Sequence, residues 1–570
     1  MQKKDILLLI CPMWGISIPP LGISYLASYL EHKGISVDLL DINIETYRNS
    51  NKTRKKLWKM ENYNVWARED WFDNMKKVFR HDLEYYAQEI LKKGYKIIGF
   101  SLYGANILFS IELAIKLKEK RPDLFVIFGG PSCSFLYNRP KMPIRMMYGI
   151  RRGRILVDPG IVDAFVVGEG EEVLFNLVNS HLSDELNPIP GAMLYLGERY
   201  SCFVPQSPIE NLDYIPYPAW DKLSLHLYLQ KGILPILLSR GCTNRCTFCN
   251  DWKIWSGKYR CRSALNIFKE INVMVKKYNI KIFQCNDLLF NGNLKMLEQL
   301  AEYLINADLN IHWSVQGAIK IDMSLSLLKK LKKSGLGMIT YGIESLSENV
   351  LKKMSKNYTF EDIRKVLEDT KRAGIGTSIN FIVGFPNETE EEFNITKRRL
   401  IEIKKYVDLI SSLNPCLINA DTDLEKFPQR FFISPLKGDF CSTWKSLDEK
   451  NTYDVRKKRA QELSEFAENL GIETLFTAIY NETDFFKENN QSYKKEKLKI
   501  FQIIRDFVKK SIQKRNIKRK KRGIFKWLVL IFVLYCTLFY IGSFWVYSIT
   551  KKTVRKIFSL GRRAKFLFEL

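Results

Sequence analysis

The apolar residues of this chain form short continuous runs that alternate with longer segments of helical spacing. In the first 170 residues the runs are rich in Ile, Leu, Val and Phe, which is typical of strands buried on both faces of a parallel sheet. Apolar residues recur every three or four positions in segments 23–33 and 106–120, which predicts helices. The order strand, helix, strand forms β-α-β units. We expect strands at residues 5–10, 35–41, 95–101, 124–128 and 163–167, with a helical insertion at 46–93.

The same alternation begins again after a linker and is repeated six times. Pro208, Pro216 and Pro218 mark the linker, because proline-rich segments between periodic stretches are typical of connections. Helices are expected at 264–278 and 294–306. Six consecutive β-α units predict a second parallel sheet, so the fold class is α/β throughout. The strands of this second series are expected at 234–239, 280–285, 309–315, 337–343, 376–383 and 408–414.

The C-terminal part of the chain has a different character. Residues 527–550 are uncharged over 24 positions, and about 20 apolar residues suffice for a membrane-spanning helix. Ten Lys and Arg residues precede this stretch in 509–526, and seven follow it in 551–570. A buried soluble helix or a segment lying in the membrane interface are the alternatives. We divide the chain into a first α/β domain (1–204), a linker (205–223), a second α/β domain (224–444), a helical basic extension (445–522) and a membrane segment with basic flanks (523–570).

The positive charge of the chain is concentrated in this tail. Of the net charge of +27, residues 491–570 carry +19, so the other 490 residues carry only +8. The basic tail could bind RNA, but because its basic residues flank the apolar segment 527–550, anionic lipid is the favoured partner. Eight of the eleven cysteines are scattered, which predicts a reducing, cytoplasmic compartment instead of a disulfide framework. No secretory signal peptide is predicted, because Met1–Asp5 leads directly into a strand.

Three cysteines lie together directly after the first strand of the second domain. Cys242, Cys246 and Cys249 have the spacing C-x3-C-x2-C. Thiolates are soft ligands that select iron–sulfur clusters, zinc or copper. A [4Fe–4S] cluster with three thiolate ligands would keep one iron open for a ligand that is not protein. A structural zinc site is the alternative, and it would need Cys261 or Cys202 as its fourth ligand.

The cysteine spacing, with Phe248 directly before the third cysteine, resembles the radical S-adenosylmethionine (SAM) superfamily. The resemblance implies a partial (β/α)6 barrel whose cluster binds SAM through the amino and carboxylate groups of its methionine moiety. It also implies that an electron from the cluster cleaves SAM to a 5′-deoxyadenosyl radical. An electron donor such as flavodoxin or ferredoxin would be a partner.

Three further residues match positions at which this family binds SAM. Asp287 follows the second strand of the barrel and corresponds to groups that bind the methionine ammonium, although it could instead cap a turn. Glu344 ends the fourth strand in Gly-Ile-Glu-Ser and corresponds to the carboxylate that binds the ribose hydroxyls. Gly384 begins the stretch Gly-Phe-Pro-Asn-Glu-Thr, which in the family meets the adenine.

The loops of the first domain resemble those of the cobalamin-binding domain that precedes many radical SAM domains. The matching stretches are Pro19–Gly22, Gly99–Ser101, Gly129–Pro131 and Gly168–Glu171. The D-x-H-x-x-G motif, whose histidine ligates cobalt, is absent, and His32 lies at a different place. A Rossmann-like domain without the cofactor is therefore the alternative. The residues expected to bind cobalamin are Gly22, Ser101, Gly129, Gly130, Gly168 and Gly170.

Together these resemblances imply a radical SAM enzyme that abstracts hydrogen from an unactivated carbon. Cobalamin-dependent methyl transfer is the expected reaction, and ring closure or carbon–carbon coupling are the family's other outcomes. Its cofactors would be a [4Fe–4S] cluster, SAM and cobalamin. The membrane segment favours a lipid-like or other small-molecule substrate and cytoplasmic catalytic domains anchored to the membrane. The alternatives are an RNA-modifying methylthiotransferase-type enzyme and a membrane-bound cluster or cobalamin sensor without enzymatic activity.

Overall fold

The computed structural model describes residues 4–59, 62–67, 69–133, 145–146, 155–156, 160–183, 187–197, 200–436 and 441–475. They all lie in one compact unit, Met1–Asn481, while the second unit, Glu482–Leu570, lies wholly outside them. The predicted membrane segment at 523–570 and the basic extension beyond residue 475 therefore fall outside the described residues. Within the described part of the chain, no helix is both long and apolar enough to cross a membrane.

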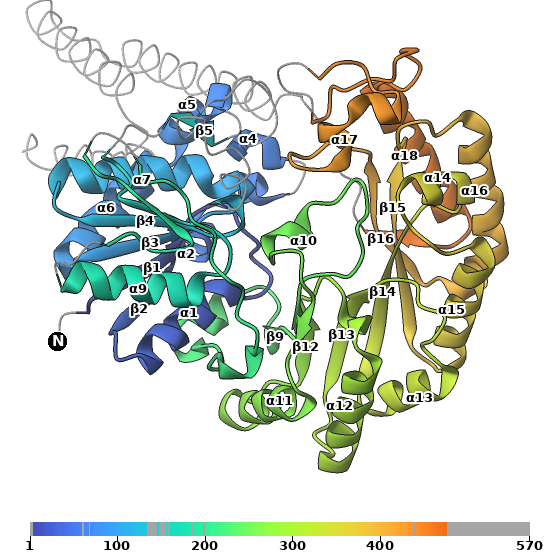
Figure 1. Cartoon of the computed structure of the whole chain (residues 1–570), viewed down its shortest axis with the longest axis horizontal. Helices are drawn as coiled ribbons and strands as arrows, with labels where there is room; N and C mark the ends of the chain where they lie inside the picture. The colour runs from blue at the N-terminus through green and yellow to red at the C-terminus, as the bar shows by residue number, and fades with distance from the viewer. Residues whose placement is uncertain are drawn as a thin grey trace, which may run out of the picture. The chain divides into compact units, whose positions relative to one another are not determined.

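The first domain is built on a six-stranded sheet with the order β2-β1-β3-β4-β7-β8 (Figure 1). The first five of these strands are parallel, whereas β8 runs antiparallel to β7, so the sheet is mixed and not purely parallel. The chain order reverses between β1 and β3, which opens a ligand crevice at their carboxyl ends. The strands are β1 (Ile6–Ile10), β2 (Val37–Asp41), β3 (Ile97–Ser101), β4 (Phe125–Gly129), β7 (Ala164–Val166) and β8 (Ala192–Leu194).

Helices cover both faces of this sheet. Helices α1 and α9 lie on one face, and α6 and α7 lie on the other (Figure 1). The predicted insertion is helical, and its aromatic side chains form a cluster in which the Trp66 ring lies 5.2 Å from Trp58 and 5.0 Å from Phe79. The helices are α1 (Leu21–His32), α2 (Ile42–Asn49), α3 (Lys52–Lys55), α4 (Tyr63–Ala67), α5 (Glu69–Val78), α6 (Arg80–Lys93), α7 (Ile107–Lys120) and α9 (Gly170–Leu182); two short strands, β5 (Arg145–Met146) and β6 (Ile155–Leu156), form a separate pair.

The second domain is built on a seven-stranded parallel sheet with the order β17-β16-β15-β14-β13-β12-β9. Its first and last strands do not pair with each other, so the sheet is an open, partial barrel. Six of the strands match the predicted ones to within three residues at either end, and β17 is an addition from beyond the predicted domain. The strands are β9 (Ile233–Ile236), β12 (Ile282–Cys285), β13 (His312–Gly317), β14 (Leu336–Glu344), β15 (Gly376–Val383), β16 (Leu409–Pro415) and β17 (Glu473–Thr474); β10 (Ser239–Arg240) pairs with β11 (Arg260–Cys261) as a separate hairpin.

The barrel helices begin at well-formed N-caps and lie along the outside of the sheet (Figure 1). The side chains of Ser263, Asn293 and Ser324 each accept a hydrogen bond from a backbone N–H in the first turn of the helix that follows. Apolar residues of these helices and of the outer strand faces form one continuous core. The helices are α10 (Asp251–Ile254), α11 (Ala264–Tyr278), α12 (Leu294–Ala307), α13 (Leu325–Lys333), α14 (Glu348–Lys353), α15 (Phe360–Arg372), α16 (Glu390–Ile403), α17 (Asp423–Lys426) and α18 (Tyr453–Asn469).

Hydrogen bonds join the two domains on either side of the predicted linker. The Tyr228 hydroxyl donates to Asp41 at the carboxyl end of β2 over 2.7 Å. The backbone N–H of Leu229 donates to the carbonyl of Ile16 over 3.0 Å. The carboxyl edge of the first sheet is thereby held against the start of the second domain.

Candidate functional site

The cysteine loop starts from a tight turn at the end of β10. Gly241 has φ of +86°, and a Cβ there would come within 1.9 Å of the Lys258 carbonyl, so only glycine fits. The loop is then tied to the barrel by Thr247, whose N–H donates to Met354 O over 3.2 Å and whose hydroxyl donates to Lys353 O over 3.1 Å. Cys242, Cys246 and Cys249 are therefore presented at the carboxyl edge of the second sheet, as predicted.

All three cysteines are free thiols and partly buried. Burial raises the pKa of each, and that of Cys249 rises to about 12 with a further contribution from the Asp251 carboxylate. The Lys356 ammonium acts in the opposite direction on Cys242 and Cys246. Metal ligation requires thiolates, so binding of iron would displace their protons.

The three thiol donors of this loop are ligands suited to an iron–sulfur cluster. Among the described residues, no three His, Cys, Asp or Glu side chains converge closely enough to hold one metal. A cubane cluster has a separate iron for each thiolate, so its cysteines need not converge on one point. Of the two candidate fourth zinc ligands, the Cys261 thiol accepts a hydrogen bond from the Asn293 amide over 3.3 Å, and Cys202 is an exposed free thiol. These three cysteines fit a [4Fe–4S] cluster with one open iron.

Asp287 lies just beyond β12 and is 3% exposed. One carboxylate oxygen accepts from the Leu238 N–H over 3.0 Å, and the other accepts from the N–H and hydroxyl of Ser239, both over 2.5 Å. Burial raises the pKa of Asp287 to about 6, although these bonds oppose the rise. These are the hydrogen bonds expected if Asp287 caps a turn. They fix the backbone at Leu238 and Ser239, and Ser239 lies three residues before Cys242. Binding of the SAM ammonium by Asp287 stays a prediction.

Glu344 ends β14 with φ of +72°, at an irregularity in the pairing with β15. Its carboxylate lies 3.7 Å from the Lys356 ammonium, which also donates to Gly342 O over 2.7 Å and lies 5.9 Å from the Phe248 ring. Burial raises the pKa of Glu344, and Lys356 opposes this effect. The strand end predicted to hold the ribose is thus linked to the cysteine loop. The sequence did not single out Lys356, because nothing local distinguishes it from the other lysines.

The Gly384–Thr389 stretch is braced by α18. The Gly384 N–H donates to a Glu388 carboxylate oxygen over 2.9 Å, and Arg459 pairs with the same oxygen over 3.2 Å. Burial raises the pKa of Glu388 to about 7. Arg456 is fully buried beside Gly384, with its guanidinium 3.8 Å from the centre of the Trp444 ring. The sequence predicted helix α18 but not this role for its arginines; the contact of Gly384 with adenine stays a prediction.

The crevice of the first domain is lined by glycines and aromatic rings. Gly130, after β4, has φ of +94°, and a Cβ there would come within 2.7 Å of the Leu102 carbonyl oxygen. The Trp14 and Tyr103 rings, from the loops after β1 and β3, meet edge to face at 4.5 Å. The other residues predicted to bind cobalamin also lie at this edge: Gly22 near the start of α1, Ser101 and Gly129 at the ends of β3 and β4, and Gly168 and Gly170 around the start of α9.

His32 does not belong to this crevice. It is the last residue of α1, which starts at the carboxyl edge of the sheet and runs back toward the amino edge before β2 begins. A residue at the end of this helix is therefore a full helix length away from the glycine loops. The structure agrees with the sequence in giving His32 no part in the site.

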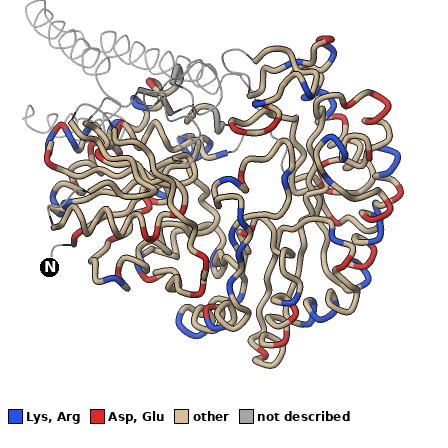
Figure 2. The backbone as a smooth tube through the Cα atoms, viewed as in Figure 1, with Lys and Arg blue, Asp and Glu red and all other residues tan. Residues whose placement is uncertain are grey.

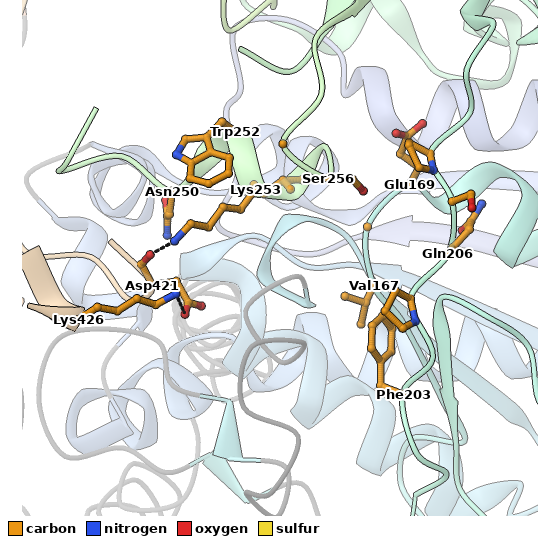
Figure 3. A pocket seen from close by; sticks show the side chains of 16 residues that line it. Val167, Glu169, Phe203, Gln206, Asn250, Trp252, Lys253, Ser256, Asp421 and Lys426 are labelled. Carbon is orange, nitrogen blue, oxygen red and sulfur yellow. Dashed lines mark hydrogen bonds and ion pairs between the residues drawn. The ribbon is translucent and has the colours of Figure 1, made fainter. Parts of the chain in front are cut away.

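A cavity of 370 Å³ lies where loops of the two domains meet. Figure 3 shows Val167, Glu169 and Phe203 on one side of it and Trp252 and Asp421 on the other. The Tyr103 hydroxyl lies close enough to α10 for the Asp251 carboxylate to add to the effect of burial and raise its pKa. The crevice of the first domain therefore faces the segment that directly follows the cysteines.

A buried cluster of four charges joins the same two edges. Arg240 pairs with Glu169 at 2.9 Å and with Glu171 at 2.5 Å, and Arg260 pairs with Glu169. All four side chains are at most 7% exposed. We call Arg240, Arg260, Glu169 and Glu171 the interdomain ion cluster. The sequence pointed to the glycines of this Gly-Glu-Gly-Glu loop but not to its carboxylates, whose partners lie about 70 to 90 residues away in the other domain.

Comparisons with known proteins identify both domains. The model of the radical SAM superfamily matches residues 236–400, and that of the B12 binding domain matches residues 15–144. The chain is 29% identical over 289 residues to an anaerobic magnesium-protoporphyrin IX monomethyl ester cyclase from Rubrivivax gelatinosus, covering 49% of both chains. It is 26% identical to an uncharacterized methyltransferase from Pyrococcus horikoshii, covering 55% of this chain and 64% of the relative. The chain thus spans about half to two thirds of these relatives' lengths.

A solved structure has the same fold. The radical SAM methyltransferase TsrM from Kitasatospora setae, with cobalamin and a [4Fe–4S] cluster bound, aligns with a TM-score of 0.56 over 75% of both chains at 16% identity. A radical SAM domain implies a [4Fe–4S] cluster and SAM, and a B12-binding domain implies cobalamin, which confirms the three predicted cofactors. The chain carries a B12-binding domain, residues 15–144, ahead of a domain of the radical SAM superfamily, residues 236–400.

Proposed function

We propose that this protein is a cobalamin-dependent radical SAM enzyme that transfers a methyl group to an unactivated carbon of a small molecule. When bound, the cluster with SAM supplies a 5′-deoxyadenosyl radical that abstracts hydrogen, and methylcobalamin supplies the methyl group. The relatives include a methyltransferase and a cyclase, so ring closure of the substrate is the second candidate reaction.

The protein's own residues would hold and orient these groups. Cys242, Cys246 and Cys249 would hold three irons and keep the fourth open for SAM. Asp287 fixes the backbone that leads into the cysteine loop through its bonds to Leu238 and Ser239. Glu344, held by Lys356 at 3.7 Å, would accept hydrogen bonds from the ribose hydroxyls.

One observation carries the proposal: the two cofactor-binding edges face each other across buried contacts. Arg240, two residues before Cys242, is paired with Glu169 and Glu171 from the loop after β7. The cavity between the domains is lined by Gly168 from the first edge and by Trp252, three residues after Cys249. A methyl donor in the first domain would therefore meet a substrate that is activated at the second.

The test is anaerobic purification of the full chain, followed by iron, sulfide and corrinoid analysis of one sample. The sample is then given SAM and a reductant, and the nucleoside products are separated. We expect stoichiometric corrinoid, 5′-deoxyadenosine from radical cleavage, and S-adenosylhomocysteine from methylation of the corrinoid. Formation of 5′-deoxyadenosine alone with corrinoid bound would favour ring closure. A sample that binds the cluster but cleaves no SAM would contradict the enzymatic proposal.

We also infer from the sequence that segment 527–550 anchors cytoplasmic catalytic domains to the membrane and that the substrate is lipid-like. Exposing 24 uncharged, mostly apolar residues to water would be costly, whereas a helix in lipid satisfies its own backbone. Full-length protein should resist extraction by carbonate and high salt and should require detergent. A chain truncated after Lys510 should be soluble and keep its cluster. Release of the full-length protein by salt alone would contradict the anchor.

A further inference from the structure

The second sheet has an outer face against its helices and an inner face turned away from them. In paired parallel strands, residues in register point to the same side, and successive residues point to opposite sides. Phe283, Trp313, Ile339, Ile379 and Ile410 belong to the core formed with the barrel helices, so they mark the outer face. The residues that alternate with them along β12–β16 therefore form the inner face.

Most of these inner positions carry hydrogen-bonding side chains without charge. These polar residues are in register across β12 to β15. Gln284 pairs with Ser314, and Thr340 pairs with both Gln316 and Ser378. Gln284 and Gln316 are exposed although their strands have neighbours on both sides, so the inner face is hollow at this level. The full set of polar inner residues is Gln284, Ser314, Gln316, Thr340, Ser378, Asn380, Ser411, Ser412 and Asn414.

Charge is confined to the upper end of this inner face. Among the described residues of β12–β16 that face inward, Glu344 at the carboxyl end is the single Asp, Glu, Lys or Arg; its carboxylate lies on the same side as a Cβ on Gly342 would, and Gly342 alternates with the outer residue Tyr341. Figure 2 shows the charged residues of this domain gathered on the outer helices, with the strands largely free of them. A carboxylate, phosphate or ammonium group in the hollow would therefore lack a partner of opposite charge below Glu344, which is energetically unfavourable.

The polar inner face differs from the interior of a closed parallel barrel, which branched apolar side chains fill. Some of its groups satisfy each other; the hydroxyls of Ser378 and Ser411, for example, form a hydrogen bond. The Asn380 carbonyl oxygen, however, is buried and has no hydrogen-bond partner in the protein. A buried acceptor without a donor is costly, and a ligand that offers an O–H or N–H group would remove the cost.

We infer that the part of the substrate that enters the partial barrel is uncharged and rich in hydroxyl or amide groups, and that it donates a hydrogen bond to Asn380. This inference rests on the proposed function, because it assigns the inner face to the substrate of the SAM-derived radical. The carbon that loses hydrogen would lie next to this polar group, between Asn380 and the SAM site at Glu344. Met338 and Ile382 also face inward and would make apolar contacts with the substrate beside its polar group.

The experiment compares three cyclitols of one shape and different charge: myo-inositol, myo-inositol 1-phosphate and scyllo-inosamine. Binding to the full-length holoprotein with SAM is measured by saturation-transfer NMR under anaerobic conditions. We expect myo-inositol to bind at least tenfold more tightly than either charged compound. Asn380→Asp should remove this preference and strengthen binding of scyllo-inosamine at least tenfold, because a carboxylate pairs with its ammonium. Asn306→Asp, the same change on the exposed surface of α12, is the matched control and should leave all three affinities unchanged.

Three outcomes would overturn the inference: a charged cyclitol binds as well as myo-inositol, none of the three binds, or Asn380→Asp leaves the preference unchanged. Formation of 5′-deoxyadenosine is measured in the same samples to separate this inference from the proposed function. Loss of SAM cleavage in the wild-type protein would count against the function itself. Intact cleavage without the expected preference would count against the uncharged substrate alone.

Discussion

The carboxyl edges of the two sheets meet at one site, yet they are made from different groups. The edge of the first sheet presents backbone groups and aromatic side chains to a ligand, namely Gly130 in a left-handed conformation and the Trp14–Tyr103 ring pair. The edge of the second sheet offers reactive and charged side chains: three thiols and the Glu344–Lys356 pair. A large, rigid cofactor is held by a matching surface, whereas a cluster and a small cationic cosubstrate are held by individual ligand atoms.

This difference predicts how the two edges respond to mutation. At the second edge, the loss of one side-chain atom removes one bond to a cofactor and leaves the fold intact. At the first edge, removal of a side chain matters less than addition of one, because the backbone itself is the binding surface. The interdomain ion cluster is a third case, since its buried ion pairs join the two edges.

The largest effect should come from the cysteines. Replacing Cys242, Cys246 and Cys249 together by Ala removes all three thiolate ligands, so we expect loss of the [4Fe–4S] absorption and of SAM cleavage. Corrinoid binding should persist, because the first edge is unchanged. Replacing Cys202, Cys285 and Cys416 by Ala is the matched control and should retain the cluster spectrum. A triple mutant of the loop that still binds nearly full iron and cleaves SAM would show that the cluster is bound elsewhere.

The next largest effect should come from breaking the interdomain ion cluster. Arg240→Gln leaves the two buried carboxylates of Glu169 and Glu171 with one arginine, Arg260, in place of two. Removal of one partner of a buried ion pair costs about 3–5 kcal/mol. We expect this loss in the free energy of unfolding in urea, together with weaker corrinoid and cluster retention. Adding Glu171→Gln should recover part of the loss, because it removes an unpaired charge.

The control for Arg240 is Arg364→Gln on the surface of α15, where the pair with Glu361 is exposed. It should leave unfolding unchanged. If the double mutant Arg240→Gln, Glu171→Gln is as unstable as the sum of the two single mutants, the charges are not coupled and the ion cluster does not join the edges.

Much of this architecture could be predicted from the sequence, because it depends on local patterns. Helix α11 has the predicted bounds, and the buried strands of both sheets gave continuous apolar runs. The cysteine loop was equally clear, since its spacing is a local property of the chain. Strands β8 and β17 were missed because two or three residues are too few to show a period.

The missed residues all act through partners that are distant in the sequence. Lys356 becomes part of the site only when α14 ends beside the cysteine loop. Glu169 and Glu171 look like first-turn helix residues until the second domain brings Arg240 to them. Asp287 shows the reverse case: the sequence suggested a ligand, and the structure gives its oxygens backbone and hydroxyl partners. Pairing across domains depends on tertiary docking, which no local pattern encodes.

A smaller effect is expected at Glu344, and it would sharpen the contrast between the edges. Glu344→Gln keeps the shape but weakens a charge-assisted hydrogen bond to the ribose, on the order of 1.5–3 kcal/mol, or about 10- to 150-fold in the SAM dissociation constant. Iron content should stay unchanged. Glu348→Gln, on the exposed side of α14, is the control. Equal SAM affinity in wild type and Glu344→Gln would reject the ribose role.

The smallest effect is expected at the glycines of the first edge. A mutation there also tests whether the backbone itself forms the binding surface for the cofactor. Gly130→Ala forces a Cβ into a left-handed conformation and to within 2.8 Å of the Leu102 nitrogen, which should cost about 1–3 kcal/mol. We expect roughly tenfold weaker corrinoid binding at the lower end of that range, measured anaerobically by titration with hydroxocobalamin. Gly337→Ala, at the amino end of β14 in the second domain, is the matched control, since a Cβ there would meet its nearest atom, the Trp313 carbonyl oxygen, at an ordinary contact distance of 3.7 Å. Both variants should keep the cluster and SAM cleavage, because the carboxyl edge of the second sheet is untouched. If Gly130→Ala binds corrinoid as tightly as Gly337→Ala does, the close backbone approach at Gly130 plays no part in holding the cofactor.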